Sequence, residues 1–170
     1  MYIKIIGALL IIGCCGGYGM LLALSHRRLV LQLCQLEQVY GQMYAELEYR
    51  LTPIPELCRL CAAQLPMPLC NVYMSLAEML ETQSANDVSS AMCLVLERHR
   101  NLPTEISKQL ELLGHNLGRF DLPGQLRGLR QCKSECERKR NELEHNQQQR
   151  LRSYQTLGFC AGAALAILLF

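Results

Sequence analysis

Apolar residues are concentrated at the two ends of this chain, and most of the polar residues lie between them. Residues 5–24 carry no charge, and residues 157–170 read LGFCAGAALAILLF. At about 1.5 Å per residue, a helix over the first run is about 30 Å long, which matches the hydrocarbon core of a bilayer. We therefore predict transmembrane helices at residues 1–24 and 154–170, with a domain of residues 25–153 between them.

Two alternatives to this anchoring stay open. The first run could be a secretory signal, because Ala23 and Ser25 form a small-residue pair that mimics a cleavage site. The second run is only about 25 Å long when counted from Tyr154, and could be a buried helix of a soluble protein. Arg150 and Arg152 precede that run and no charge follows it. By the positive-inside rule, this asymmetry predicts that the central domain faces the cytoplasm.

The central region has helical spacing almost throughout. Apolar residues recur every three or four positions before Arg50, so the first helix is predicted to continue to that residue. Stretches rich in proline, glycine or polar residues then separate the later helices. These are predicted at residues 53–64, 67–82, 88–101, 103–117 and from 122 onward. Thr52, Asp87 and Asp121 are the predicted N-caps.

The predicted fold class is all-α. Short loops favour antiparallel neighbours, which indicates an antiparallel bundle of about six helices whose first and last members extend into the two spans. Residues 137–152 have Leu143 and Leu151 as their only apolar positions, so this stretch has little core to face. We interpret it as a solvated, membrane-proximal stalk. For residues 144–150, a frayed linker is an equal alternative.

The chain contains 10 cysteines, and two pairs have spacings that occur at metal sites. Cys58 and Cys61 form one pair, and Cys132 and Cys136 form the other. Four thiolates would suit zinc. On helices, however, these spacings only place both members of a pair on one face, so we favour core thiols. A membrane-tethered thiol or zinc sensor is the alternative function.

Other chemistry has little support in the sequence. The histidines are scattered, and neither a phosphate-binding loop nor a nucleophile elbow occurs, so we predict no catalytic site and no metal or other cofactor. A net charge of +2 and the absence of tryptophan argue against a nucleic-acid partner.

A basic segment runs from Arg127 to Arg140, and a solvated helix face is its simplest interpretation. The functional interpretations are contact with anionic lipid head groups or with an acidic protein partner. The candidate partner-binding residues are Arg127, Arg130, Lys133, Asp121 and Gln125.

Small residues are spaced four apart in both apolar runs. Gly13 and Gly17 lie in the first run, and Gly158 and Gly162 lie in the second. Such faces let helix backbones approach closely in lipid. They predict that the two spans pack together or associate with other membrane subunits, including further copies of this chain.

Three stretches resemble one protein family. Residues 49–57, YRLTPIPEL, are similar to its Leu/Arg-Thr-Pro-Leu-Pro-Glu hinge, and residues 117–125, LGRFDLPGQ, to its Leu-Gly-x-x-Asp-x-x-Gly-Gln motif. Residues 154–159, YQTLGF, are similar to its Tyr-x-x-Leu-Gly-Phe entry into the last span. Order, spacing and the two-anchor layout agree over nearly the whole chain. The family is stage III sporulation protein AB of endospore-forming bacteria, from which this chain departs in its cysteine content and at Pro66–Pro68.

The resemblance implies a location and partners that composition does not. Family members are mother-cell membrane proteins of an apparatus that links the mother cell to the forespore. Their cytoplasmic domain is similar to that of the platform protein of type II secretion and type IV pilus systems. The implied partners are a cytoplasmic secretion-type ATPase of the same operon and other membrane proteins of the sporulation channel. The implied function is a non-enzymatic, membrane-anchored scaffold that couples to this ATPase.

Overall fold

The described part of the chain forms six α-helices and contains no strand. This computed structural model describes the backbone of residues 2–118 and 121–169, and the side chains of residues 25–118 and 121–145. The helices are α1 (Tyr2–Tyr49), α2 (Ile54–Ala62), α3 (Leu69–Glu81), α4 (Val88–Arg98), α5 (Thr104–Asn116) and α6 (Leu122–Leu169). The predicted all-α bundle is confirmed.

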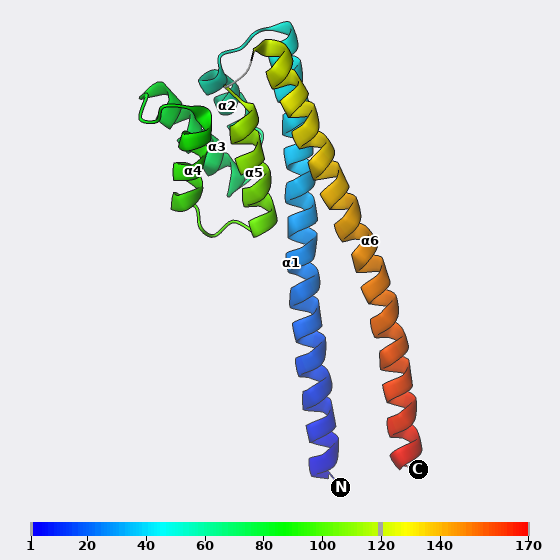
Figure 1. Ribbon diagram of the computed structural model, residues 1–170. Helices are drawn as coiled ribbons and strands as arrows, with labels where there is room; N and C mark the ends of the chain where they lie inside the picture. The colour runs from blue at the N-terminus through cyan, green and yellow to red at the C-terminus, as the bar shows by residue number, and fades with distance from the viewer. Residues whose placement is uncertain (1, 119–120, 170) are drawn as a thin grey trace.

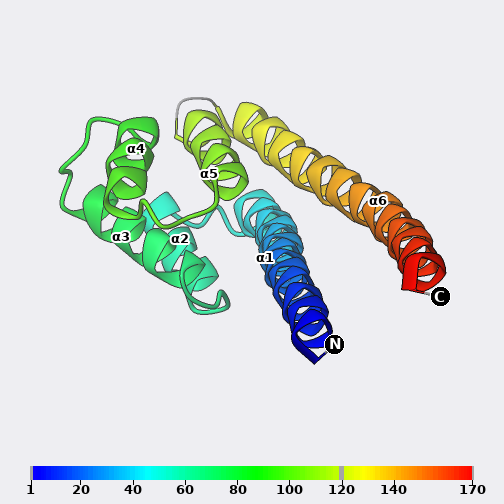
Figure 2. The ribbon, with the colours of Figure 1, turned by 90° about the horizontal axis from the view of Figure 1, so that it is seen from below.

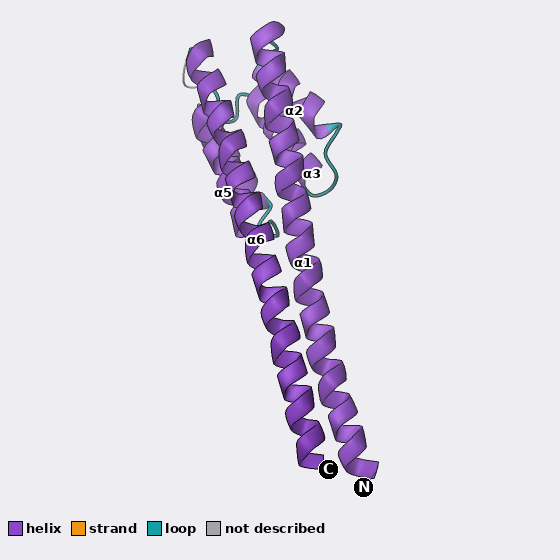
Figure 3. Ribbon diagram, turned by 90° about the vertical axis from the view of Figure 1, so that its right-hand side faces the viewer, coloured by secondary structure: helices purple, strands orange, loops and turns teal. Residues whose placement is uncertain are grey.

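The long helices α1 and α6 lie side by side and run in opposite directions, so both chain ends lie at the same end of the molecule (Figures 1 and 3). Each has 48 residues, or about 72 Å of helix. A buried stripe with three- and four-residue spacing joins them, because that spacing aligns side chains on one helical face. It includes Leu33, Leu36, Tyr40 and Met43 of α1, and Leu129, Cys132 and Cys136 of α6.

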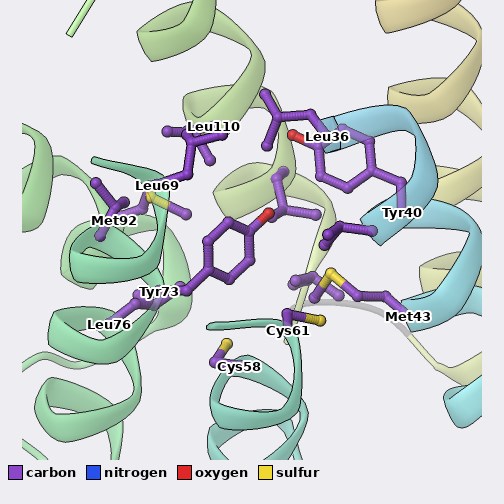
Figure 4. Packing of buried hydrophobic residues seen from close by; sticks show 14 of the residues in the cluster. Leu36, Tyr40, Met43, Cys58, Cys61, Leu69, Tyr73, Leu76, Met92 and Leu110 are labelled. Carbon is purple, nitrogen blue, oxygen red and sulfur yellow. The ribbon is translucent and has the colours of Figure 1, made fainter. Parts of the chain in front are cut away.

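The short helices α2–α5 pack beside the half of this pair that is far from the chain ends (Figures 1 and 2). Successive helices contact each other, and α5 contacts both α1 and α6. One hydrophobic cluster fills the space between them. In its centre, Tyr73 of α3 extends toward Tyr40 of α1 (Figure 4). The bundle therefore fixes the orientation of α1 and α6 along the segment that carries the basic residues.

Most of the predicted helix limits are close to the observed ones, because prolines and capping residues set them. Asp87 caps α4, where its Oδ1 accepts a hydrogen bond from Ser90 N at 2.9 Å. Gly118 ends the α5 segment with a φ of 78°, a left-handed conformation that favours glycine. The predicted N-cap role of Thr52 is wrong. Its hydroxyl instead donates to Glu46 Oε2 at 3.1 Å, and α2 begins without a side-chain cap.

The stalk prediction needs a partial correction. Helix α6 is continuous through residues 144–150, so the structure has a helix there rather than a frayed linker. The start of the stalk is also not fully solvated. Leu143 packs against the hydrophobic cluster, and Arg140 forms an ion pair with Glu37 of α1 at 3.3 Å. The first turns of the predicted stalk therefore pack against the bundle and α1.

Within residues 25–118 and 121–145, no helix is long and apolar enough to cross a membrane. The side chains of the two predicted spans lie outside these described residues. The same holds for the predicted packing positions Gly13, Gly17, Gly158 and Gly162. The spans and the domain limits at 24 and 153 therefore stay predictions.

Candidate functional site

The six cations between Arg127 and Arg140 separate into two groups of three. The C-terminal group is neutralised by acidic neighbours, two of them within the same helix turn or the next. Its pairs are Arg138 with Glu135 at 2.8 Å, Lys139 with Glu142 at 3.3 Å, and Arg140 with Glu37 at 3.3 Å. For this group, the interpretation as an ordinary solvated and ion-paired face is sufficient.

The N-terminal group consists of Arg127, Arg130 and Lys133, which we call the basic face. All three side chains are exposed. None of them has an ion pair with a carboxylate among the described residues, although Glu137 follows Lys133 by one helical turn. Arg127 Nε donates instead to the backbone oxygen of Pro123 at 3.3 Å. These three charges are therefore available to an external anion.

Arg130 is held by an aromatic side chain of the neighbouring helix. Its guanidinium lies over the ring of Tyr44 at 4.9 Å from the ring centroid and donates to the Tyr44 hydroxyl. That hydroxyl in turn donates to Glu48 Oε1 at 3.0 Å. A cation over an aromatic face contributes about 0.5–1 kcal/mol at an exposed site. The contact therefore limits the orientations available to the guanidinium.

The Lys133 side chain lies beside Gly41 of α1, which has no side chain. A Cβ placed on Gly41 would lie 3.8 Å from Lys133 Nζ. A surface groove of about 220 Å³ lies between the two helices at this level. Its lining residues are Tyr40, Gly41, Tyr44, Leu129, Arg130 and Lys133. We call it the α1–α6 groove.

The two remaining candidate residues begin α6. Asp121 Oδ1 accepts a hydrogen bond from Gly124 N at 3.2 Å, and the Asp121 carbonyl accepts one from Gln125 N at 3.0 Å. Asp121 is therefore the N-cap, as predicted, and its carboxylate is in use within the turn. Gln125 is half-buried. Both residues lie at the end of the molecule opposite the chain termini (Figure 1).

An exposed apolar pair lies at the same end of the molecule. Tyr49 is 81% exposed and Leu51 is 65% exposed. Leu51 also has a φ of 54°, in the left-handed region that a leucine rarely adopts. The sequence predicts Tyr49 within the first helix and gives no signal that it is exposed.

The cysteine pairs lie in the core. Cys58 and Cys61 of α2 lie near Tyr73 (Figure 4), and Cys132 and Cys136 line the α6 side of the core. Burial, reinforced by the neighbouring Cys61 thiol, raises the pKa of Cys58 to about 12. Burial likewise raises the pKa of Cys136 to about 12. Such thiols stay protonated at neutral pH, whereas nucleophiles and metal ligands are thiolates.

A metal centre is not formed by the described side chains either. Among residues 25–118 and 121–145, no group of three or more histidine, cysteine or acidic side chains is arranged to hold an ion. The thiol or zinc alternative therefore has no supporting geometry in that part of the chain. The best candidate functional site is the basic face with the groove beside it.

Comparison with known families identifies the fold. The family model of stage III sporulation protein AB matches residues 4–170. The chain belongs to the stage III sporulation protein AB family. The resemblance of the three sequence stretches is thereby confirmed, and the protein is related to sporulation. A solved structure of a stage III sporulation protein AB has the same fold, with a TM-score of 0.63 and 21% sequence identity. It covers 72% of this chain and 98% of its own chain, while the curated proteins gave no match.

Proposed function

We propose that this stage III sporulation AB family member is a membrane-anchored scaffold without catalytic activity. In this proposal, residues 1–24 and 154–170 anchor it in the mother-cell membrane. The helical domain between them faces the cytoplasm and couples a secretion-type ATPase of the same operon to a sporulation channel, as the platform protein does in secretion systems. The observation that carries the proposal is an unpaired basic face on a rigid helix pair whose other end leads into two apolar segments.

Two features support the anchoring. The antiparallel arrangement of α1 and α6 brings both apolar runs to the same end of the molecule. Lipid could then cover both runs at once, while the bundle stays on one side. Protease added to intact mother cells should leave the central helices uncut, and a carbonate wash should leave the protein in the membrane. Release by carbonate would overturn the anchoring.

The position of the basic face supports docking to a soluble partner. Arg127 lies less than two helical turns from the start of α6, at the end of the molecule farthest from the apolar runs. A partner that binds there needs no contact with the bilayer. Unpaired surface cations also raise association rates with acidic surfaces, because their field is not cancelled locally.

Co-purification of the ATPase with the full chain in nanodiscs tests the coupling. We expect capture of the ATPase by the wild-type protein. We also expect loss of capture and of sporulation, with normal membrane insertion, after the double charge reversal Arg127→Glu and Arg130→Glu. The matched control is Arg98→Glu with Arg100→Glu, which changes the charge equally on the far side of the bundle. Absence of capture in every nucleotide state would refute the coupling role.

A further inference from the structure

The α1–α6 groove combines two cations with an empty space of defined size. Its volume is about 220 Å³. This volume is below the roughly 300–1,000 Å³ of small-molecule sites. The groove therefore suits a single side chain of a larger partner better than a cofactor.

The chemistry of the walls selects an anionic side chain. Arg130 and Lys133 are three residues apart on α6, where like charges repel each other. Arg130 is oriented by Tyr44, and the Lys133 ammonium lies beside the backbone of Gly41. A carboxylate in the groove would reach both cations and relieve their repulsion. Glu48 of α1 is connected to Arg130 only through the Tyr44 hydroxyl, and Glu37 of α1 pairs with Arg140.

Lipid head groups are a poor source of this anion. Gly41 lies 17 residues beyond the predicted end of the first span, or about 25 Å along the helix axis. Lys133 lies 21 residues before the second span, or about 30 Å. The screening length at physiological salt is about 8 Å, so a bilayer surface exerts little attraction at this distance. An acidic protein partner remains.

We propose that the groove between Gly41, Tyr44, Arg130 and Lys133 binds one aspartate or glutamate side chain of the partner ATPase. This inference rests on the proposed function, because it names the part of the domain that meets that partner. The carboxylate lies between the guanidinium and the ammonium, and the Tyr44 ring forms the apolar wall beside it. The groove then acts as the specific contact within the broader basic face.

The test compares neutral substitutions at two places on α6. The first variant is Arg130→Gln with Lys133→Gln, which removes both groove cations without introducing acids. The matched control is Arg138→Gln with Lys139→Gln, two exposed or half-exposed cations of the same helix that already have acidic partners. Affinity for the purified ATPase is measured with the full chain in nanodiscs, at low and high salt.

We expect the groove variant to bind roughly 30-fold more weakly at low salt, as is typical when a paired interfacial charge is removed. The control should bind within about twofold of wild type, since its cations are already paired and exposed pairs contribute little. High salt should weaken the wild type more than the groove variant. Equal affinity of wild type, groove variant and control would overturn the groove while leaving the coupling proposal intact. Failure of the wild type to bind the ATPase at all would overturn both.

A second substitution tests the groove with both cations retained. Gly41→Glu introduces a carboxylate from α1 itself, next to Lys133, and therefore supplies the anion within the chain. We expect the same loss of ATPase binding as in the groove variant, together with a folded and more stable domain. Gly41→Gln fills the same space without adding a charge, so it should reduce ATPase binding less than Gly41→Glu does. Unchanged binding of Gly41→Glu would refute the groove, even if the cation variants had failed to fold.

Discussion

Two buried tyrosine hydroxyls in the core should have opposite effects on stability. Tyr40 and Tyr73 are both fully buried and extend into the same cluster from α1 and α3 (Figure 4). The Tyr40 hydroxyl donates to the backbone oxygen of Gln109 in α5 at 3.1 Å. The Tyr73 hydroxyl interacts with that of Tyr40 but makes no hydrogen bond of normal length with any described residue. Burial raises the pKa of both tyrosines, so both hydroxyls stay protonated.

The expected free energies follow from the cost of an unpaired polar group. Tyr40→Phe removes one hydrogen bond, whose net contribution is about 1 kcal/mol, while the Gln109 oxygen keeps its helical partner. Tyr73→Phe removes a buried hydroxyl whose unpaired state costs about 1–3 kcal/mol. Part of that gain is lost because the space left by the oxygen stays empty. We therefore expect Tyr40→Phe to lower the free energy of unfolding by about 1 kcal/mol, and Tyr73→Phe to raise it by about 0–2 kcal/mol.

Thermal unfolding of the full chain in mild detergent, followed by circular dichroism, measures this difference. For a domain of this size, 1 kcal/mol shifts the midpoint by about 4 °C. Tyr49→Phe is the control, because that hydroxyl is on a side chain that is 81% exposed and its removal should change nothing. A loss at Tyr73 as large as that at Tyr40 would refute the reasoning. It would mean that the Tyr73 hydroxyl has a partner in solution.

Further predictions concern backbone positions and thiols. Gly128→Ala should destabilise the domain by about 1–3 kcal/mol, because the new Cβ would lie 2.6 Å from the Asn116 side chain of α5. Gly41→Ala should stabilise α1 by about 0.5–1 kcal/mol, because the nearest contact of its Cβ is at 3.8 Å. Urea unfolding measures both changes. Gln83→Gly should raise the unfolding free energy by about 1 kcal/mol, since Gln83 ends α3 with a φ of 50°. At pH 8, iodoacetamide followed by mass spectrometry should modify the exposed Cys93 and spare the buried Cys58 until the protein unfolds. Because burial raises the Cys58 pKa from 9.0 to about 12, the unfolded chain loses that proton first, and stability should fall as the pH rises above about 9.

The helices could be predicted from the sequence because local signals set their limits. Asp87 and Asp121 are N-caps in both the prediction and the structure, and the unbroken spacing before Arg50 gives the long α1. The predicted N-cap role of Thr52 is wrong because of a tertiary contact. The Glu46 carboxylate, near the end of α1, accepts a hydrogen bond from the Thr52 hydroxyl. The sharp connection at Leu51 brings these two residues together. Propensity for capping does not reveal such a competing partner.

The charge pairing on α6 could be predicted only in part. The absence of acids three or four residues from Arg127 and Arg130 is visible in the sequence, and it agrees with their unpaired state. Glu137 lies four residues after Lys133, a spacing that favours an ion pair on a helix. The structure has no such pair among its described residues, and Lys133 lies beside Gly41 instead. The position of Lys133 beside Gly41 depends on the neighbouring helix α1, which the spacing of charges along α6 does not reveal.

The groove itself depends on the register between α1 and α6. Both helices repeat apolar residues every three or four positions, so their packing faces remain compatible when one helix slips by a turn. Such a slip would place Lys133 opposite Glu37, and an ion pair between them would neutralise the Lys133 charge. In the observed register Glu37 pairs with Arg140, and Lys133 meets a glycine. The close approach of Gly128 to Asn116 of α5 opposes the slip, since any other residue at the α5 contact would collide. The unpaired state of Lys133 therefore depends on steric constraints on the far side of α6, which the run of charges alone does not show.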